Sequence, residues 1–223
     1  MGALTNKFEN VLIDWLIRAQ AIGLNGASAA AGTGLANTYI GLITTSKGPR
    51  ANSTAYALND TLSLTANDGK THLYKCTTAG TTAASQAALY PGTNDEAITD
   101  GTATMTEQYT ALEAGTYGNE VTGAGYARVG VVSSLANWAG TQGPGTTVAS
   151  SGTNGTTSNN GAITYGPTTA SWGFIAAAGM FDSLSGGSQI TYGTLPAGLV
   201  KTVNSGDASP SFAAAQLTFQ IDN

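Results

Sequence analysis

The N-terminal residues place apolar and polar side chains with the period of an α-helix. Asn6 and Glu9 predict a capping box at its start, and Gly23 predicts its end. Such a pattern indicates an amphipathic helix whose apolar stripe must be buried against a partner. We therefore expect the stripe to dock the helix on a particle or on another copy of the chain. The stripe consists of Phe8, Val11, Leu12, Trp15, Leu16, Ala19 and Ile22.

Beyond residue 36 the pattern changes to short β-branched and aromatic runs between Gly-rich turns, which is typical of β-strands. A buried strand is predicted at 37–44. Two hairpins are predicted around the turns at Asn67-Asp-Gly and Asp100-Gly, because both supply the positive φ of tight hairpin loops. Further strands are predicted at 126–132, 162–165, 171–175, 180–181, 189–192, 199–203 and 217–221.

These strands are not separated by helical crossovers, which disfavours a parallel α/β sheet. We predict an all-β fold: an antiparallel β-sandwich or jelly-roll-like domain with an N-terminal amphipathic helix and a small β-hairpin insertion. The expected division is a docking helix at 1–24, a sandwich domain at 25–56 and 109–223, and an inserted β module at 57–108. The small-residue stretch 26–34 would tether the helix. The stretch 140–161, rich in Gly, Thr, Ser and Asn, predicts a surface loop or an arm that a neighbour could order.

Composition changes this picture in one respect. Hydrophobic residues make up 41% of the chain but charged residues only 9%, against roughly 25% in an average globular protein. So few charges indicate that much of the surface is covered by neighbouring subunits. The net charge of −5 excludes nucleic-acid binding through clustered Lys and Arg. Membrane insertion is not expected, since no apolar run approaches the roughly 20 residues of a span. Charged residues near the N-terminus also disfavour a signal peptide.

Candidate chemistry is sparse. The one histidine, His72, and the one cysteine, Cys76, share a strand face but lie about 13 Å apart along it. They therefore predict no Cys–His dyad, and together they cannot form a zinc site. A metal ion shared across a symmetry axis would leave His72 as the candidate ligand. The thiol of Cys76 is expected to be buried.

The remaining candidates are carboxylates and aromatic rings. Glycosidase-like acid pairs could come from the group at 95, 96 and 100 or from Glu113 with Glu120. Residues in Gly- and Thr-rich loops are ordinarily solvated, so we predict no catalytic residue, cofactor or metal. Aromatic side chains could line a sugar groove, although a core or interface role is favoured. They are Tyr74, Tyr90, Tyr109, Tyr117, Trp138 and Trp172.

Several motifs together resemble a known family. They are the Tyr-Ile-Gly-Leu strand at 39–42, a Gly-Tyr-Ala-Arg run at 125–128, and the segments 163–165, 172–173, 181–182, 186–187, 192–195 and 206–207. This pattern resembles small bacteriophage virion proteins of the tail-fibre-like or head-decoration type. The segments 73–80 and 98–102, with Met105, resemble a phage repeat of the carbohydrate-binding-module type that tends to carry an aromatic residue where Met105 stands.

The resemblance implies a non-enzymatic virion protein without catalytic residues or cofactors. We expect a fibre-like or decoration protein that assembles as a homo-oligomer and binds other virion proteins of the capsid, neck or tail. A homotrimer is expected by analogy with phage fibres. The alternative is an adhesin that binds host-surface carbohydrate through 57–108, which predicts a shallow aromatic groove there. Synthesis in the host cytoplasm and localisation in the virion follow from the same resemblance.

Overall fold

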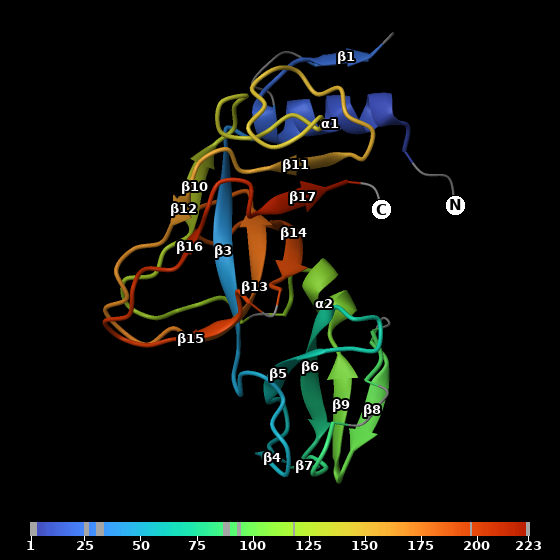
Figure 1. The fold of residues 1–223 in the computed structure, drawn as a ribbon, viewed down its shortest axis with the longest axis vertical. Coiled ribbons are helices and arrows are strands. Elements are labelled where there is room, and N and C mark those ends of the chain that lie inside the picture. The colour runs from blue at the N-terminus through green and yellow to red at the C-terminus, as the bar shows by residue number, and fades with distance from the viewer. Residues whose placement is uncertain are drawn as a thin grey trace.

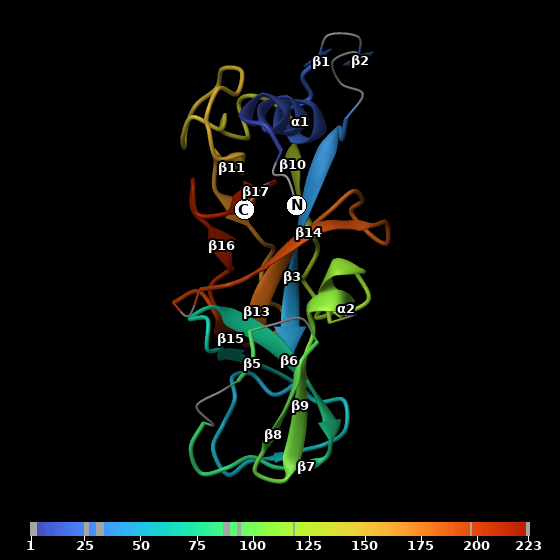
Figure 2. The same cartoon turned by 90° about the vertical axis from the view of Figure 1, so that its right-hand side faces the viewer.

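The computed structural model describes all residues except 1–3, 25–26, 30–33, 87–89, 93–94, 118, 197 and 222–223. The molecule is elongated, with α1 and β1 at one end and β4 and β7 at the other (Figure 1, Figure 2). Strands dominate the described residues, so the predicted all-β, sandwich-like class is confirmed. The elements are α1 (Asn6–Arg18), β1 (Ile22–Leu24), β2 (Ala27–Ala29), β3 (Asn37–Thr45), β4 (Ala55–Tyr56), β5 (Thr61–Thr65), β6 (Thr71–Thr78), β7 (Gly80–Thr81), β8 (Ala97–Asp100), β9 (Ala103–Glu107), α2 (Tyr109–Glu113), β10 (Val129–Val132), β11 (Thr156–Ser158), β12 (Ile163–Thr164), β13 (Gly173–Phe181), β14 (Gln189–Thr194), β15 (Lys201–Val203), β16 (Ser211–Phe212) and β17 (Thr218–Gln220).

A five-stranded antiparallel sheet forms the centre of the molecule. Its strand order is β10-β3-β13-β14, and β15 also pairs with β13. On the long strands β3 and β13, Ile40 lies opposite Met180 and Leu42 opposite Ala178. All four side chains belong to the main core cluster, which Phe212 of the β12–β16 pair joins from a second layer. Two layers of strands around one core are what the alternation of apolar residues predicts for a sandwich.

The region predicted as an insertion contains a second sheet, with the order β5-β6-β9-β8. Its core includes Tyr74 and Tyr90, whose rings meet edge to face with centroids 5.1 Å apart. A third cluster connects this sheet to the main one, because Leu73 of β6 packs with Ala176 and Ala177 of β13. The boundaries of 57–108 as a separate module stay a prediction.

Both predicted hairpins form. β8 and β9 are joined by a two-residue loop, since Asp100 pairs with Ala103 and Gly101 has a φ of 66°. The β5–β6 loop is longer than predicted: Thr65 pairs with Thr71, and the loop 66–70 places Gly69 at a φ of 78°. In each loop a glycine takes the left-handed conformation that other residues reach only at a cost.

The Gly-Tyr-Ala-Arg run at 125–128 contacts two strands of the main sheet. The Tyr126 hydroxyl accepts a hydrogen bond from the Leu42 backbone N–H (2.9 Å) and donates one to Glu120 (2.8 Å). Arg128 donates two hydrogen bonds to the Glu120 carboxylate, at 2.8 and 2.7 Å, and its guanidinium lies 3.5 Å from the ring centre of Phe181. The motif is thus a structural clamp on β3 and β13.

Several elements differ from the predictions. The strands predicted at 171–175 and 180–181 belong to one strand, β13, which accommodates the intervening small residues with a register shift between Ile175 and Ala177. The short helix α2 and the strands β11 and β16 were not predicted. β11 and β16 are three and two residues long, too short to carry a recognisable alternation.

Candidate docking surface at the N-terminal helix

Helix α1 begins one residue earlier and ends sooner than predicted. The N-cap is Thr5, whose hydroxyl accepts from the Phe8 backbone N–H at 3.4 Å, rather than Asn6. The helix ends at Arg18, and Ala19 takes the left-handed conformation with φ 56°. Ala19 and Ile22 of the predicted stripe therefore lie outside the helix, and Ile22 begins β1. Beyond this turn the Gln20 backbone N–H donates to the Asp14 carbonyl at 2.9 Å, and the Gln20 side chain donates to the Arg18 carbonyl at 2.9 Å.

The face that α1 buries is the opposite of its predicted stripe. Ile13 and Ile17 are fully buried in the main core, and Arg18 is buried beside them. On the other side, Phe8 is 38% exposed. The rest of the predicted stripe is half-buried: Val11, Leu12, Trp15, Leu16, Ala19 and Ile22. Most of the stripe is therefore not part of the core of a single chain, although Leu16 packs against that core.

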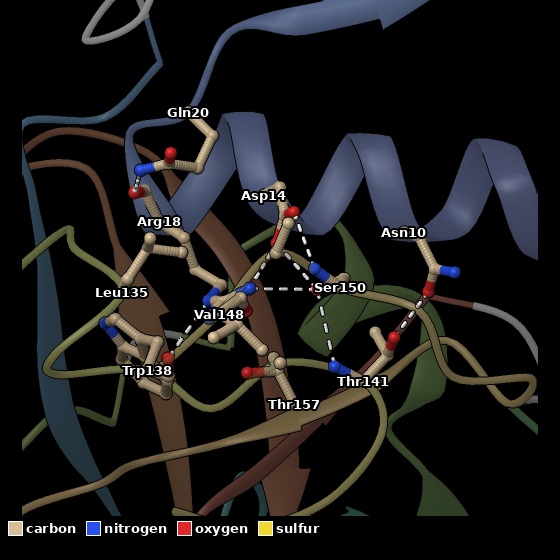
Figure 3. A network of polar contacts seen from close by, with 12 residues as sticks. Asn10, Asp14, Arg18, Gln20, Leu135, Trp138, Thr141, Val148, Ser150 and Thr157 are labelled. Atoms are coloured by element: carbon tan, nitrogen blue, oxygen red, sulfur yellow. Dashed lines mark hydrogen bonds and ion pairs between the residues drawn. The ribbon is translucent and has the colours of Figure 1, made fainter. Parts of the chain in front are cut away.

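Charged residues fix the buried face (Figure 3). The Arg18 guanidinium pairs with the Asp14 carboxylate one turn earlier and donates to the Trp138 carbonyl (3.0 Å) and the Val148 carbonyl (2.7 Å). The Asp14 carboxylate accepts from the Ser150 backbone N–H at 2.8 Å and from its hydroxyl at 2.6 Å. The buried charges of Asp14 and Arg18 thus have specific partners, as burial demands.

The Gly-rich stretch 140–161, which we predicted as a loop or an arm ordered by a neighbour, is held by this helix. In addition to the Ser150 contacts, Asn10 donates to the Gly152 carbonyl at 3.0 Å and accepts from the Thr141 hydroxyl. The segment 129–181 contains no charged residue. The charged groups that contact its backbone therefore come from Asp14 and Arg18 of α1. The i,i+4 spacing of Asp14 and Arg18 beside Ile13 and Ile17 was the sequence signal for this contact.

The predicted tether is only partly described. Residues 27–29 form β2, which pairs with β1, whereas 25–26 and 30–33 lie outside the described residues. Just beyond, the Leu35 N–H donates to the Leu16 carbonyl at 3.1 Å. The chain therefore returns along α1 before it enters β3.

Exposed apolar side chains gather at the same end of the molecule. Leu4 and Phe8 lie at the start of α1, Val148 lies in the loop that Arg18 holds, and Val132 ends β10, which points toward α1 (Figure 1). Val132 and Val148 are 55% and 62% exposed. Elsewhere among the described residues, only Leu58 and Leu184 are large, apolar and exposed. We call the set Leu4, Phe8, Val11, Leu12, Trp15, Val132 and Val148 the apolar end.

His72 and Cys76, which we considered for catalysis or metal binding, lie outside the apolar end. His72 lies between two carboxylates, 3.0 Å from Asp68 and 3.2 Å from Glu107, and makes no described contact with Cys76. Cys76 is buried, as predicted, and burial raises the pKa of its thiol. In the described part of the chain, no group of three or more His, Cys, Asp or Glu side chains could hold a metal ion.

Two of the carboxylates considered for an acid pair, Asp100 and Glu120, form ion pairs with arginines instead. Burial opposes the ionisation of Asp100, but hydrogen bonds from Arg50 (2.7 Å) and Tyr90 (2.6 Å) hold the pKa of this carboxyl below its usual value. Glu120 pairs with Arg128 (2.7 Å). Glu113 ends α2, and its side chain lies outside those described. Asp95 and Glu96 precede β8, and the Asp95 carboxylate accepts from the Thr110 backbone N–H at 3.1 Å.

The aromatic residues mostly fill cores. Tyr74, Tyr90, Trp138 and Trp172 are at most 4% exposed, which confirms the core role for these four. Tyr109 and Tyr117 are partly exposed. The shallow aromatic groove that an adhesin role predicts for 57–108 therefore cannot be built from Tyr74 and Tyr90.

Two comparisons with known proteins bear on this architecture. The family model described as podophage GP4 fiber I protein gp80 matches residues 103–220, just over half of the chain, from β9 to β17. No curated protein matches the chain. Among the described residues, no helix has the length and apolar character needed to cross a bilayer.

Proposed function

Because the chain belongs to the podophage GP4 fiber I protein gp80 family, we propose that it is a fibre protein anchored in the phage particle through its apolar end. Membership makes the chain a structural component of a phage virion. The family match begins at residue 103, so the N-terminal helix lies outside it. The docking role of α1 rests on the geometry of the helix alone.

The observation that carries the proposal is a second apolar side on α1, opposite the core-facing Ile13 and Ile17. A helix on a globular protein normally turns its apolar stripe to the core and its charges to solvent. In α1 the charges of Asp14 and Arg18 are buried, whereas Phe8 and Trp15 lie on the outward side. Burying such a side chain from full exposure contributes about 1.5 to 3 kcal/mol, and covering the 38% of Phe8 that is exposed contributes a corresponding fraction. A partner that covers the apolar end therefore gains binding free energy, because it buries apolar surface that stays exposed in the single chain.

We propose that this partner belongs to the virion and that the chain binds it as a homo-oligomer, in particular a homotrimer. Two observations support an oligomer: the scarcity of charged residues, at 9% of the chain, and the concentration of exposed apolar residues at one end. Threefold symmetry is the analogy with phage fibres. Labelled virions would distinguish three sites of attachment: the capsid, as a decoration, the neck and the tail.

The proposal is tested by the double variant Phe8→Asp/Trp15→Asp. We expect it to keep the β-type circular-dichroism spectrum and the melting temperature of the wild type within a few degrees. It should be missing from purified virions or sediment as a monomer instead of at three times the 22.3 kDa chain mass. Mass spectrometry of virions separates particle docking from oligomer contact, which sedimentation reports.

The matched control is Leu58→Asp/Leu184→Asp, which makes the same change at two exposed apolar positions outside the apolar end. It should assemble like the wild type. Normal incorporation and normal mass of the Phe8→Asp/Trp15→Asp variant would overturn the docking role. Failure of that variant to fold would place the stripe in the core instead.

The alternative proposal is an adhesin that binds host-surface carbohydrate through 57–108. The aromatic rings Tyr74 and Tyr90 of the 57–108 region are buried, and Met105, which stands where related repeats carry an aromatic residue, is buried as well. The carbohydrate-binding alternative therefore depends on a groove outside this core.

A further inference from the structure

Two Asn-Gly pairs lie in the loop that α1 holds. They are Asn154-Gly155, just before β11, and Asn160-Gly161, just after it. Asparagine is a thermolabile residue, because its side-chain carbonyl carbon can be attacked by the backbone nitrogen of the next residue. A following glycine has no Cβ and leaves that nitrogen open to the approach. The two pairs therefore have similar intrinsic chemistry, and the structure decides how readily each of them reacts.

The side chain of Asn160 is held away from this reaction. Its amide nitrogen donates to the carbonyls of Ala136 (3.2 Å) and Thr146 (3.4 Å). Its amide oxygen accepts from the Gly145 N–H at 3.1 Å, and the residue is partly buried. An amide that is bonded at both ends can approach the Gly161 nitrogen only after the loop opens locally.

Asn154 lacks such restraints. It is exposed, and its amide nitrogen donates no hydrogen bond to the described residues. Its amide oxygen accepts a long hydrogen bond from the Thr156 N–H, at 3.4 Å. The attacking nitrogen belongs to Gly155, whose N–H donates to none of the described backbone or side-chain groups. The long contact with Thr156 is thus the one hydrogen bond within the described part of the chain that ring closure has to break.

Gly155 is required at this position by its packing. Its φ is 55°, in the left-handed region, and a Cβ on this residue would lie 2.9 Å from the Glu9 carboxylate of α1. On the other side, the Gly155 carbonyl accepts from the Ile221 N–H at 3.1 Å, and β11 pairs with β17 directly beyond it. The pair 154–155 therefore lies where α1, the loop and the C-terminal strand meet (Figure 1).

We propose that Asn154-Gly155 is a site of spontaneous deamidation that loosens this junction. The Gly155 nitrogen bonds to Cγ of Asn154, and the bond between Cγ and Nδ2 breaks. Ammonia leaves with the proton of the Gly155 N–H, so that a succinimide ring forms. Water then opens the ring at either carbonyl and gives aspartate or isoaspartate. Water is the co-reactant, and no electrons are transferred.

Isoaspartate is the product that disturbs the fold. It routes the main chain through the side chain and so adds a carbon atom between residues 154 and 155. The contacts of Gly155 with Glu9 and Ile221 need the original spacing, so the inserted atom should weaken them. Both products also add a negative charge to a loop that has none of its own. This inference does not depend on the docking role of α1.

The test incubates the full-length protein at mildly alkaline pH. Tandem mass spectrometry with electron-transfer fragmentation follows each asparagine and separates isoaspartate from aspartate. In the folded protein, Asn154 should convert at least about ten times faster than Asn160, because Asn160 reacts only after local opening. In urea the two rates should become similar. The unfolded chain is the matched control, since it keeps both sequences and removes the structure.

Asn154→Gln is the control variant, because its longer side chain has to close a larger ring and reacts far more slowly. After the same incubation, the wild type should melt at a lower temperature than this variant, whereas the fresh proteins should melt alike. Equal conversion of Asn154 and Asn160 in the folded protein, or an unreacted Asn154, would overturn the proposed site. If the aged wild type melts like the aged variant, deamidation does not loosen the junction.

Discussion

The two ends of the molecule each bury an ion pair, but they differ in the apolar side chains that they leave exposed. At the far end, the small sheet hides tyrosines in its core and satisfies Asp100 with Arg50 and Tyr90. At the α1 end, the Asp14–Arg18 pair lies inside beside Ile13 and Ile17, and further apolar side chains such as Phe8 lie outside. Leu58 is the one exposed large apolar residue described in the segment from β4 to β9.

This difference indicates which end of the chain binds a partner. A surface that exposes few apolar side chains needs no partner to cover it, whereas one that exposes several at one place marks an interaction site. Burying the pair Asp14–Arg18 also fixes α1 in one orientation, because its hydrogen bonds are directional. The helix is therefore a rigid part of the proposed docking surface.

Of these variants, Arg18→Met should lower the free energy of unfolding most. It leaves the Asp14 carboxylate buried without its cation and removes the donors to the Trp138 and Val148 carbonyls, which should cost about 3 to 5 kcal/mol of unfolding free energy. Urea denaturation measures this. Lys7→Met, at an exposed position of the same helix, should change stability by less than about 0.5 kcal/mol. A loss below about 1 kcal/mol for Arg18→Met would mean that the α1 contact with the loop is dispensable.

Leu73→Ala sharpens the comparison at the junction of the two sheets. Leu73 is fully buried against Ala176 and Ala177, so its removal should lower the unfolding free energy by about 2 to 5 kcal/mol. Thermal melts followed by circular dichroism should keep a single transition at lower temperature. Two separate transitions in the wild type would contradict this, because they would mean that the small sheet unfolds independently.

Acid should destabilise the far end through Asp100. Its folded-state pKa is held below the usual value, so the unfolded state binds the proton first. The stabilisation is complete above the unfolded value of about 3.9 and is lost as the pH falls through the folded value. Asp100→Asn should therefore flatten the decline of stability in this acid range, measured by urea melts at stepped pH. A parallel decline in both proteins would show that Asp100 contributes nothing to it.

The smallest effect is expected on the outward side of α1. Phe8→Ala should change the stability of the monomeric chain by less than about 1 kcal/mol, because 38% of the side chain is already exposed. Ile17→Ala, on the inward side of the same helix, should cost about 2 to 5 kcal/mol. Equal losses in urea melts would remove the distinction between the two faces.

The sequence predicted the regular parts of this fold. The β-branched and aromatic runs around Ile40 and Thr191 predicted strands of the main sheet, and Asp100-Gly predicted a tight hairpin. These predictions succeed because a strand buried on one face and a turn with positive φ leave local marks in the sequence. Short strands such as β16 depend on pairing partners far away in the chain, which no local pattern records.

The candidate site was predicted in part. The stripe of α1 was identified, but its orientation could not be derived from periodicity, since Ile13 and Ile17 form a second apolar line on the opposite side. Arg18 determines which of the two lines faces the core, because it donates hydrogen bonds to carbonyls about 120 residues away. Such contacts follow from the tertiary fold alone.

The central claim is that the apolar stripe of α1 becomes covered on assembly. Carbene footprinting read by mass spectrometry measures this on the unmodified protein, in virions and in the chain diluted to monomer. Phe8, Val11 and Trp15 should lose most of their labelling in the virion, while Leu58, exposed at the far end, keeps its own. Equal labelling of Phe8 and Trp15 in both states would contradict the account.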